Sequence, residues 1–239
     1  MSDSTENRRK QILWAVVREF VDSAEPVGSA TIVEKYDFGV SPATVRNDMV
    51  WLEEQGLLKQ PHPSAGRIPT ELGYRYFVNE FVAAEKPRDP QEEHRQQLAQ
   101  LRRLVRDDLQ RSARLFAQQL AQLTEGTAFT RLENGRLHLA GLSNLVKHPE
   151  FRDTELLFAV TQALDRLEQT LAQLEGRMRH DVEVLIGTDN PFGCGTSAVV
   201  VRYADPQIGQ GIVGLLGPER MDYESNYNLM RYLRDVFSE

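Results

Sequence analysis

Residues 41–48 (SPATVRND) bring together side chains that can distinguish base pairs in a duplex. Arg46 can donate two hydrogen bonds to O6 and N7 of guanine, and Asn47 can form two hydrogen bonds with adenine. Ala43 and the methyl group of Thr44 can contact the methyl group of thymine. These residue types and this spacing point to the reading of base edges, provided that the segment lies on an exposed helix.

A second group of polar residues surrounds the loop at residues 61–66. His62, Ser64, Arg67 and Arg75 lie on or beside this loop, where they can bind phosphates along a duplex or enter its minor groove. Serine and glycine are also ordinary turn residues, so the loop needs them in either case. We expect Arg67 to be the exposed cation of the group and a phosphate contact.

The elements that must position these residues have clear local signals. Ser41 is a good N-cap for a helix over residues 42–55, and the other residues of that segment carry an apolar stripe at helical spacing. Without a DNA-binding context, Arg46 and Asp48 would simply form a solvated face of this helix. Helices are also predicted at 7–23 and 29–36, and short strands at 57–60 and 67–70. Three helices followed by a two-stranded hairpin form a winged helix-turn-helix.

The rest of the chain alternates helical and strand patterns. We predict an α+β fold with a winged helix-turn-helix domain at 1–83, a linker at 84–90 and an antiparallel sheet domain flanked by long helices at 91–239. The expected helices are 70–81, 91–123, 153–175 and 219–237, and the expected strands are 128–132, 136–140, 182–186, 198–201 and 212–216.

The predicted helix at 153–175 carries six apolar residues with spacings of 3, 4, 3, 4 and 3. This stripe is a candidate dimer contact, because a regular apolar seam can pair with a second copy. It is too short for an established coiled coil, so packing against a sheet explains it equally well. The residues are Leu157, Val160, Leu164, Leu167, Leu171 and Leu174.

Composition excludes several classes of protein. A single cysteine, Cys194, forms no internal disulfide, and the histidines lack a metal-ligand spacing, so we expect neither a metal nor another cofactor. Neither an export signal nor a membrane span is apparent, which favours a cytoplasmic location. Serine, histidine and carboxylate residues show no catalytic spacing, and we do not expect an enzyme.

The overall charge of the chain does not by itself indicate a polyanionic partner. The chain has a net charge of −7, and residues 1–82 contain nine Lys or Arg against twelve Asp or Glu. A DNA interface must therefore depend on the local arrangement of charges, and we expect two copies of the domain to be needed. The GxGxxG pattern at 209–214 continues into an apolar strand without a following βαβ unit, so its glycines are assigned to the strand.

Residues 41–78 (SPATVRNDMVWLEEQGLLKQPHPSAGRIPTELGYRYFV) resemble the HrcA family of heat-inducible transcription repressors, and the wing segment PHPSAGRIPT is highly specific. Further resemblance lies at 139–151 (LAGLSNLVKHPEF) and 211–223 (GIVGLLGPERMDY). The resemblance implies a dimer that binds an inverted-repeat operator upstream of chaperone genes. It also implies that the GroE chaperonin promotes the DNA-binding form, and that the second domain is GAF-like. Between Leu123 and Leu139 this chain has only a short hairpin where the family carries a longer insertion.

Two alternatives remain open at this point. The GAF-like domain could hold a small molecule that sets the spacing of the DNA-binding domains, which would make the chain a ligand-responsive transcription regulator. The winged helix could instead be a protein-interaction module, which its acidic balance allows. Specific binding to an operator that weakens steeply with salt separates the last alternative from DNA recognition.

Overall fold

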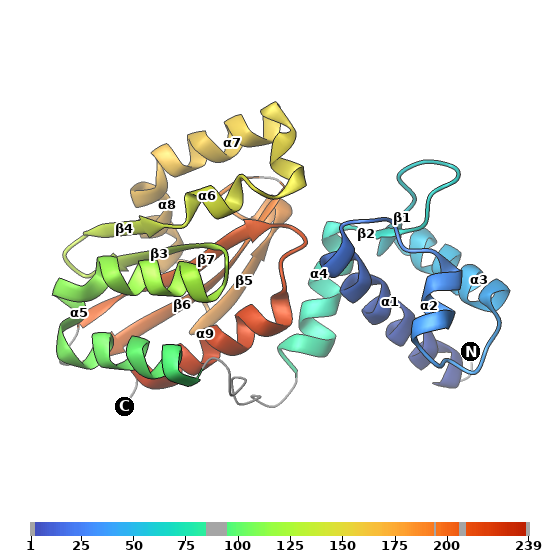
Figure 1. Cartoon of the computed structure of the whole chain (residues 1–239), viewed down its shortest axis with the longest axis horizontal. Coiled ribbons are helices and arrows are strands. Elements are labelled where there is room, and N and C mark those ends of the chain that lie inside the picture. The colour runs from blue at the N-terminus through green and yellow to red at the C-terminus, as the bar shows by residue number, and fades with distance from the viewer. Residues whose placement is uncertain (1–2, 85–94, 194, 206–208, 238–239) are drawn as a thin grey trace. The chain divides into compact units, whose positions relative to one another are not determined.

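The computed structural model describes residues 3–84, 95–193, 195–205 and 209–237 (Figure 1). The chain divides into two compact units, Met1–Glu85 and Lys86–Glu239, which we call the N-terminal domain and the sheet domain. The predicted linker at 84–90 lies outside the described residues except for Ala84, as do the first four residues of the helix predicted at 91–123.

The N-terminal domain contains helices and a two-stranded hairpin in the expected order. Its strands are antiparallel, with Leu58 opposite Pro69 and Lys59 opposite Ile68. The predicted helix at 70–81 consists of an α-helix followed by a π-helical turn. The elements are α1 Asp3–Ser23, α2 Ser29–Lys35, α3 Pro42–Glu54, β1 Leu58–Lys59, β2 Ile68–Pro69, α4 Glu71–Phe77 and the π-helix Val78–Val82.

Burial of one face of each helix holds the N-terminal domain together. Ile12, Leu13 and Val16 of α1 are fully buried, and so are Ile32 of α2 and Val45 of α3. Burying a side chain of this size contributes about 1.5–3 kcal/mol. The apolar stripes recognised in the sequence therefore face one common core, which leaves the opposite face of α3 free.

The sheet domain contains a five-stranded sheet in the order β4-β3-β7-β6-β5, with antiparallel neighbours throughout. This arrangement confirms the predicted fold class, an N-terminal helix-turn-helix followed by a helix-flanked antiparallel sheet. The elements are α5 Arg95–Leu123, β3 Thr127–Leu132, β4 Leu137–Ala140, α6 Leu142–Leu145, the 3-10 helix Pro149–Arg152, α7 Thr154–Asp165, α8 Leu167–Glu175, β5 Val182–Ile186, the 3-10 helix Gly187–Asp189, β6 Thr196–Asp205, β7 Gly209–Pro218 and α9 Tyr223–Phe237.

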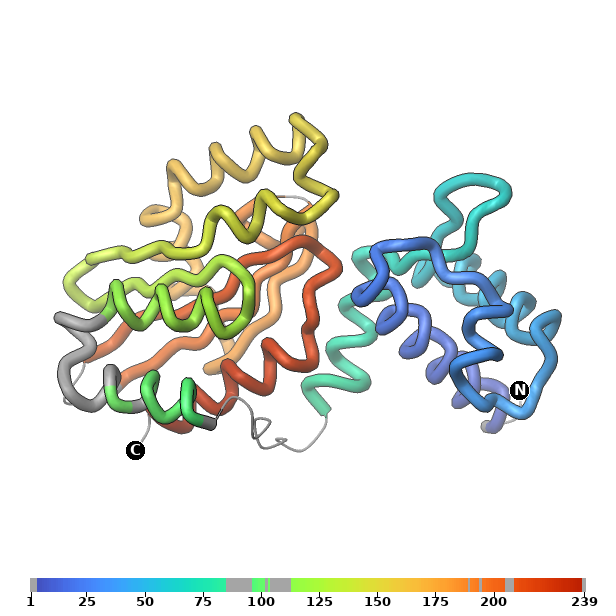
Figure 2. The backbone as a smooth tube through the Cα atoms, in the orientation of Figure 1, coloured from blue at the N-terminus to red at the C-terminus, as the bar shows by residue number. Residues whose placement is uncertain are grey.

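Helices cover both faces of the sheet (Figure 2). On the face of α5 and α9, the rings of Phe116 and Phe237 lie 6.0 Å apart, and Tyr203 stacks on Phe237 at 4.6 Å. On the other face, Leu171 of α8 belongs to one buried cluster with Phe129 of β3. Because each face is covered, β6 and β7 carry continuous apolar runs at 198–201 and 212–216.

The glycines of the GxGxxG pattern lie within β7, as predicted. A Cβ atom on Gly211 would lie 2.2 Å from the carbonyl oxygen of Arg131, and one on Gly214 would lie 2.1 Å from the Phe129 ring. These positions accept only glycine because neighbouring atoms approach the backbone closely. The pattern therefore serves sheet packing.

The predicted single helix at 153–175 is wrong, because the chain bends at Arg166 and forms α7 and α8. Helix α7 packs on the 3-10 helix Pro149–Arg152 and on the loop around Gly195, whereas α8 packs on β7. One straight rod cannot follow these two surfaces. The sequence shows no glycine or proline at the bend, so no local signal announced it.

Candidate nucleic-acid interface

Helix α3 begins with a complete N-terminal cap. The Oγ atom of Ser41 accepts a hydrogen bond from the backbone N–H of Thr44 at 3.2 Å, and the two hydroxyl oxygens lie 3.1 Å apart. A serine cap stabilises a helix by about 1 kcal/mol. Ser41 and Thr44, both candidates for DNA contact, thus already fix the start of the helix that carries the other candidates.

The outer face of α3 carries Ala43, Arg46 and Asn47, and all three are exposed. The opposite face is buried through Val45, Met49 and Leu52. Within the part of the chain that the structure describes, Arg46 and Asn47 have no hydrogen-bond or ion-pair partner. Their donors and acceptors are available to a ligand, which is the condition for direct reading of base edges.

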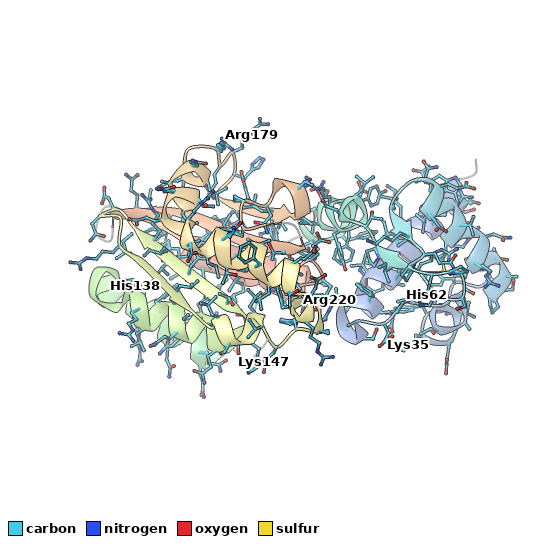
Figure 3. All side chains as sticks on the ribbon, turned by 90° about the horizontal axis from the view of Figure 1, so that it is seen from above. Lys35, His62, His138, Lys147, Arg179 and Arg220 are labelled. Atoms are coloured by element: carbon cyan, nitrogen blue, oxygen red, sulfur yellow. The ribbon has the colours of Figure 1, made fainter. Side chains whose placement is uncertain are left out.

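The wing is the loop between β1 and β2. The Nε2 atom of Gln60 donates hydrogen bonds to the carbonyl oxygens of Pro63 (3.1 Å) and Ala65 (2.9 Å), which closes the loop. His62 and Ser64 are exposed on it, and Figure 3 labels His62. Both candidates therefore lie on the surface of a loop whose shape is fixed by the hydrogen bonds of Gln60.

A backbone bridge ties the wing to the connection between α1 and α2. Val27 and Arg67 exchange two backbone hydrogen bonds of 2.9 and 2.8 Å. Gly66 makes this close approach possible, since a Cβ atom there would lie 2.4 Å from the carbonyl carbon of Val27. The bridge adds a third segment to the two-stranded hairpin and fixes the base of the wing.

The expectation that Arg67 is freely exposed is wrong. Its side chain is 14% exposed, and its Nε atom donates to Oε2 of Glu53 at 2.8 Å. Arg75 likewise donates to Glu71, one turn earlier on α4, at 2.6 Å. The end of α3 and the base of the wing pack together, and this packing brings Glu53 to Arg67 across 14 residues of sequence. Arg67 thus holds the wing against α3.

Replacing Arg67 by alanine is expected to weaken binding to operator and random duplexes by the same factor, because the wing loses its ion pair with α3. The loss of stability should be about 1 kcal/mol or less. Titration of both duplexes measures the affinities. Glu53→Gln distinguishes loss of the ion pair from loss of the positive charge, because it breaks the pair and leaves Arg67 in place. Equal weakening in both variants supports a positioning role, and an Arg67→Ala protein with unchanged affinities contradicts it.

The cations of the N-terminal domain divide into paired and unpaired ones. Lys10 pairs with Glu80 at 2.9 Å and Lys35 pairs with Glu19 at 2.5 Å. Lys59 on β1 is exposed and, among residues 3–84, has no ion-pair partner, as is also the case for Arg46. Sequence reasoning missed Lys59, although an exposed lysine directly before the wing loop is a usable signal. The unpaired positive charge therefore gathers at α3 and the wing despite the acidic balance of the domain.

Asp48 is buried, so its interpretation as part of a solvated face is wrong. It is 3% exposed and accepts hydrogen bonds from Arg8 and Arg9 of α1. The guanidinium of Arg9 also lies 4.2 Å from the centre of the Trp51 ring. Helix α3 is consequently held to α1 by charged as well as apolar contacts.

The candidate dimer stripe packs largely within its own domain. Val160, Leu167, Leu171 and Leu174 belong to the buried cluster on the sheet, and Leu164 packs against that cluster. Leu157 is partly buried, and the neighbouring Phe158 is 64% exposed. Most of the stripe is thus engaged in the core, and its α7 end is the part that reaches the surface.

A cavity of about 450 Å³ in the sheet domain bears on the ligand-binding alternative. Its polar wall includes Arg131 of β3, which pairs with Glu175 of α8 and whose Nε atom is buried with no partner among the described residues. The cavity is open to solvent and its lining is mainly polar, so it fits a small polar ligand better than an apolar one. The lining residues are Arg131, Glu133, Ala172, Glu175, Gly176 and Gln210.

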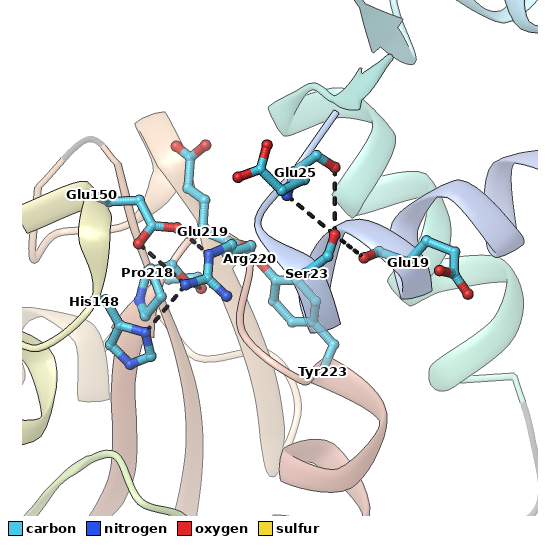
Figure 4. A network of polar contacts seen from close by, with 10 residues as sticks. Glu19, Ser23, Glu25, His148, Glu150, Pro218, Glu219, Arg220 and Tyr223 are labelled. Atoms are coloured by element: carbon cyan, nitrogen blue, oxygen red, sulfur yellow. Dashed lines mark hydrogen bonds and ion pairs between the residues drawn. The ribbon is translucent and has the colours of Figure 1, made fainter. Parts of the chain in front are cut away.

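The two further segments of family resemblance meet within the sheet domain. Arg220, which follows β7, donates to Glu150 and lies 3.5 Å from Nδ1 of His148 (Figure 4). Burial and the neighbouring guanidinium of Arg220 lower the pKa of His148 below its ordinary value. This cluster joins the chain before α7 to the residues that follow the central strand β7.

A helix-turn-helix with a wing, in one chain with a helix-flanked sheet, defines a DNA-binding transcription regulator. The N-terminal domain matches the DeoR-like helix-turn-helix domain over residues 31–70. Residues 78–226 match the HrcA protein C-terminal domain, and the chain belongs to the HrcA family of heat-inducible transcription repressors. Membership of this family agrees with the prediction that the chain is not an enzyme.

Curated relatives support this assignment. The heat-inducible transcription repressor HrcA of Desulforudis audaxviator is 27% identical over 333 residues, with 95% of each chain covered. That of Symbiobacterium thermophilum is 28% identical over 337 residues, with 98% of each chain covered. Both alignments are longer than the 239 residues of this chain, so the relatives carry residues that it lacks.

One solved structure shows the same fold. The crystal structure of a hypothetical protein at 2.2 Å resolution has a TM-score of 0.77 and 20% sequence identity, and the match covers 100% of this chain and 99% of the other. No helix among the described residues is long and apolar enough to cross a membrane.

Proposed function

We propose that the protein is a sequence-specific repressor of chaperone genes that binds an inverted-repeat operator as a homodimer in the cytoplasm. The exposed and unpaired side chains of Arg46 and Asn47 on α3 carry this proposal. Helix α3 is the second helix of the helix-turn-helix, which is the element that enters the major groove in such domains.

The candidate residues on α3 each have a defined role in this proposal. Arg46 donates two hydrogen bonds to a guanine, and Asn47 pairs with an adenine, each contact discriminating by about 1–3 kcal/mol. Ala43 and Thr44 pack against thymine methyl groups. Lys59, His62 and Ser64 contact phosphates from the wing.

Arg46→Ala and Asn47→Ala are each expected to reduce the ratio of operator affinity to random-DNA affinity by about tenfold or more, because a bidentate base contact is lost. Stability should change little, since both side chains lie outside the core. Fluorescence anisotropy with an operator duplex and a scrambled duplex measures the ratio, and Glu54→Ala at the exposed end of the same helix is the control. Unchanged ratios in both variants would remove the base contacts from the proposal.

Dimerisation is proposed because a single small reading domain makes few contacts on a duplex, and two-fold symmetry matches an inverted repeat. The α7 end of the leucine stripe, with Leu157 and the exposed Phe158, is the candidate contact surface. Sedimentation equilibrium at micromolar concentration tests this point. A mass equal to one chain, both free and on operator DNA, would contradict it.

The dependence on the GroE chaperonin is proposed from the family resemblance. In this scheme damaged proteins compete for the chaperonin and repression is released. Footprinting on DNA upstream of chaperone genes, with and without purified chaperonin, tests it. Equal protection in both reactions would show that this chain represses without chaperonin assistance.

A second candidate function is regulation by a small molecule in the sheet domain. The cavity at Arg131 and Glu175 supports it, because the buried Nε atom of Arg131 has a hydrogen bond left to donate. A bound ligand must raise the thermal unfolding temperature of the state that it binds. A thermal-shift screen of metabolites, compared with addition of chaperonin, distinguishes the two modes of regulation.

A further inference from the structure

One carboxylate and two guanidinium groups form a compact cluster where α1 meets α3. The Nε atom of Arg8 lies 2.8 Å from Oδ2 of Asp48, and the Nε atom of Arg9 lies 3.0 Å from Oδ1. The Asp48 side chain is 5% exposed, whereas the side chains of Arg8 and Arg9 are 23% and 16% exposed. We call these three residues the Arg8 cluster. Arg8 uses only its Nε atom for this ion pair, and its side chain stays partly open to the surface.

The Arg8 cluster differs from the other ion pairs of the N-terminal domain. Lys10 meets Glu80, Lys35 meets Glu19, and Arg67 meets Glu53, each cation with its own carboxylate. In the cluster, Arg8 uses Nε for Asp48, and its two terminal nitrogens make no further hydrogen bond to the described residues. A guanidinium fork held in this way is prepared for a second anion.

The cluster lies on one side of the proposed base-reading face. Asp48 directly follows Asn47, and Trp51, over which Arg9 stacks, lies one turn after Asn47 on the same side of α3. A helix of about 10–12 Å diameter fills a major groove that is about 12 Å wide, so the phosphates of the two strands run along its flanks. Donors on the Asn47 flank of α3 therefore come next to one strand of phosphates.

We propose that the Arg8 cluster is a binding site for a DNA backbone phosphate, contacted by the terminal nitrogens of Arg8. This inference rests on the proposed DNA-binding function and adds α1 to the interface. Asp48 orients Arg8 through its Nε atom, and Arg9 holds the other carboxylate oxygen of Asp48 while its guanidinium lies on Trp51. A phosphate bound there fixes the depth of α3 in the groove and carries no base preference.

The test compares Arg8→Gln with Lys10→Gln, which removes one positive charge from the same region of α1. Arg8→Gln is expected to weaken binding to operator and random duplexes by the same factor. A plot of the logarithm of the DNA association constant against the logarithm of salt concentration has a negative slope. Arg8→Gln should make this slope less steep by about 0.9, the value of one phosphate contact. Lys10→Gln should leave the slope at the wild-type value. Arg8→Lys keeps the charge and should keep most of the slope.

Circular dichroism at the assay temperature checks that each variant is folded. If Arg8→Gln is unfolded, Arg8→Lys is compared with the wild type instead. An Arg8→Gln protein with wild-type slope and wild-type affinities overturns the proposal, and so does an Arg8→Lys protein whose slope becomes less steep by a full ~0.9 although the charge is kept. Loss of operator preference with an unchanged slope also overturns it, since Arg8 would then only position α3. If the wild-type chain binds every duplex with equal affinity, the proposed function as a sequence-specific repressor is refuted. The comparison of salt slopes on random DNA still tests whether Arg8 contacts a phosphate.

Discussion

Gly66→Ala is expected to displace the wing and to lower the affinity for DNA more than any single side-chain truncation in the wing. The new Cβ atom would lie 2.4 Å from the carbonyl carbon and oxygen of Val27 and 2.7 Å from its nitrogen. Backbone atoms cannot rotate away as a side chain can, so the two hydrogen bonds between Val27 and Arg67 must break or shift. Overpacking of this kind costs about 1–3 kcal/mol.

Urea unfolding of the N-terminal domain and titration of an operator duplex measure both consequences. Gly28→Ala is the matched control, because it lies next to Val27 and its Cβ atom would meet only Thr31 Oγ1 at 3.9 Å. The control should lose less stability and keep its affinity for DNA. If Gly66→Ala equals the wild type in both measurements, the wing is not held by this contact.

Leu171→Ala is expected to lower the free energy of unfolding of the sheet domain by about 2–5 kcal/mol. Leu171 is fully buried, and it shares a cluster with Phe129 of β3 and Val200 of β6. Removal of its side chain leaves a cavity between α8 and the sheet that rigid strands cannot close. The effect should not depend on protein concentration, since the contacts lie within one chain.

Urea unfolding at two protein concentrations at least tenfold apart tests this point. Leu115→Ala on α5, where the leucine is 47% exposed, is the control and should change stability much less. If the loss of stability in Leu171→Ala is larger in the more dilute sample, the leucine stripe contributes to a dimer interface. The same loss at both concentrations assigns Leu171 to the core.

The N-terminal domain was predictable because its signals are local. A serine cap starts α3, an apolar stripe at helical spacing gives its buried face, and a proline-flanked loop marks the wing. In the sheet domain, the hairpin of β3 and β4 was equally accessible through its Asn134-Gly135 turn. The strands β6 and β7 are longer than predicted, because glycine and polar residues at their ends weaken the strand pattern while the ladder of hydrogen bonds continues.

The break at Arg166 was not predictable from the leucine stripe, whose spacing continues through it. The stripe reports only that one side of the segment is apolar. It does not report whether the partner is a sheet, a loop or a second chain, since apolar surface is buried without regard to its source.

The sequence by itself determined which face of α3 is apolar and therefore which side chains, Arg46 and Asn47, are left outside. Only the tertiary structure decided which charges of the domain remain available to a ligand. Arg8 meets Asp48 across 40 residues and Arg67 meets Glu53 across 14, so two cations that look alike in the sequence receive different roles. A helical period is a property of neighbouring residues, whereas an ion pair depends on how distant elements pack, and no local pattern encodes that distance.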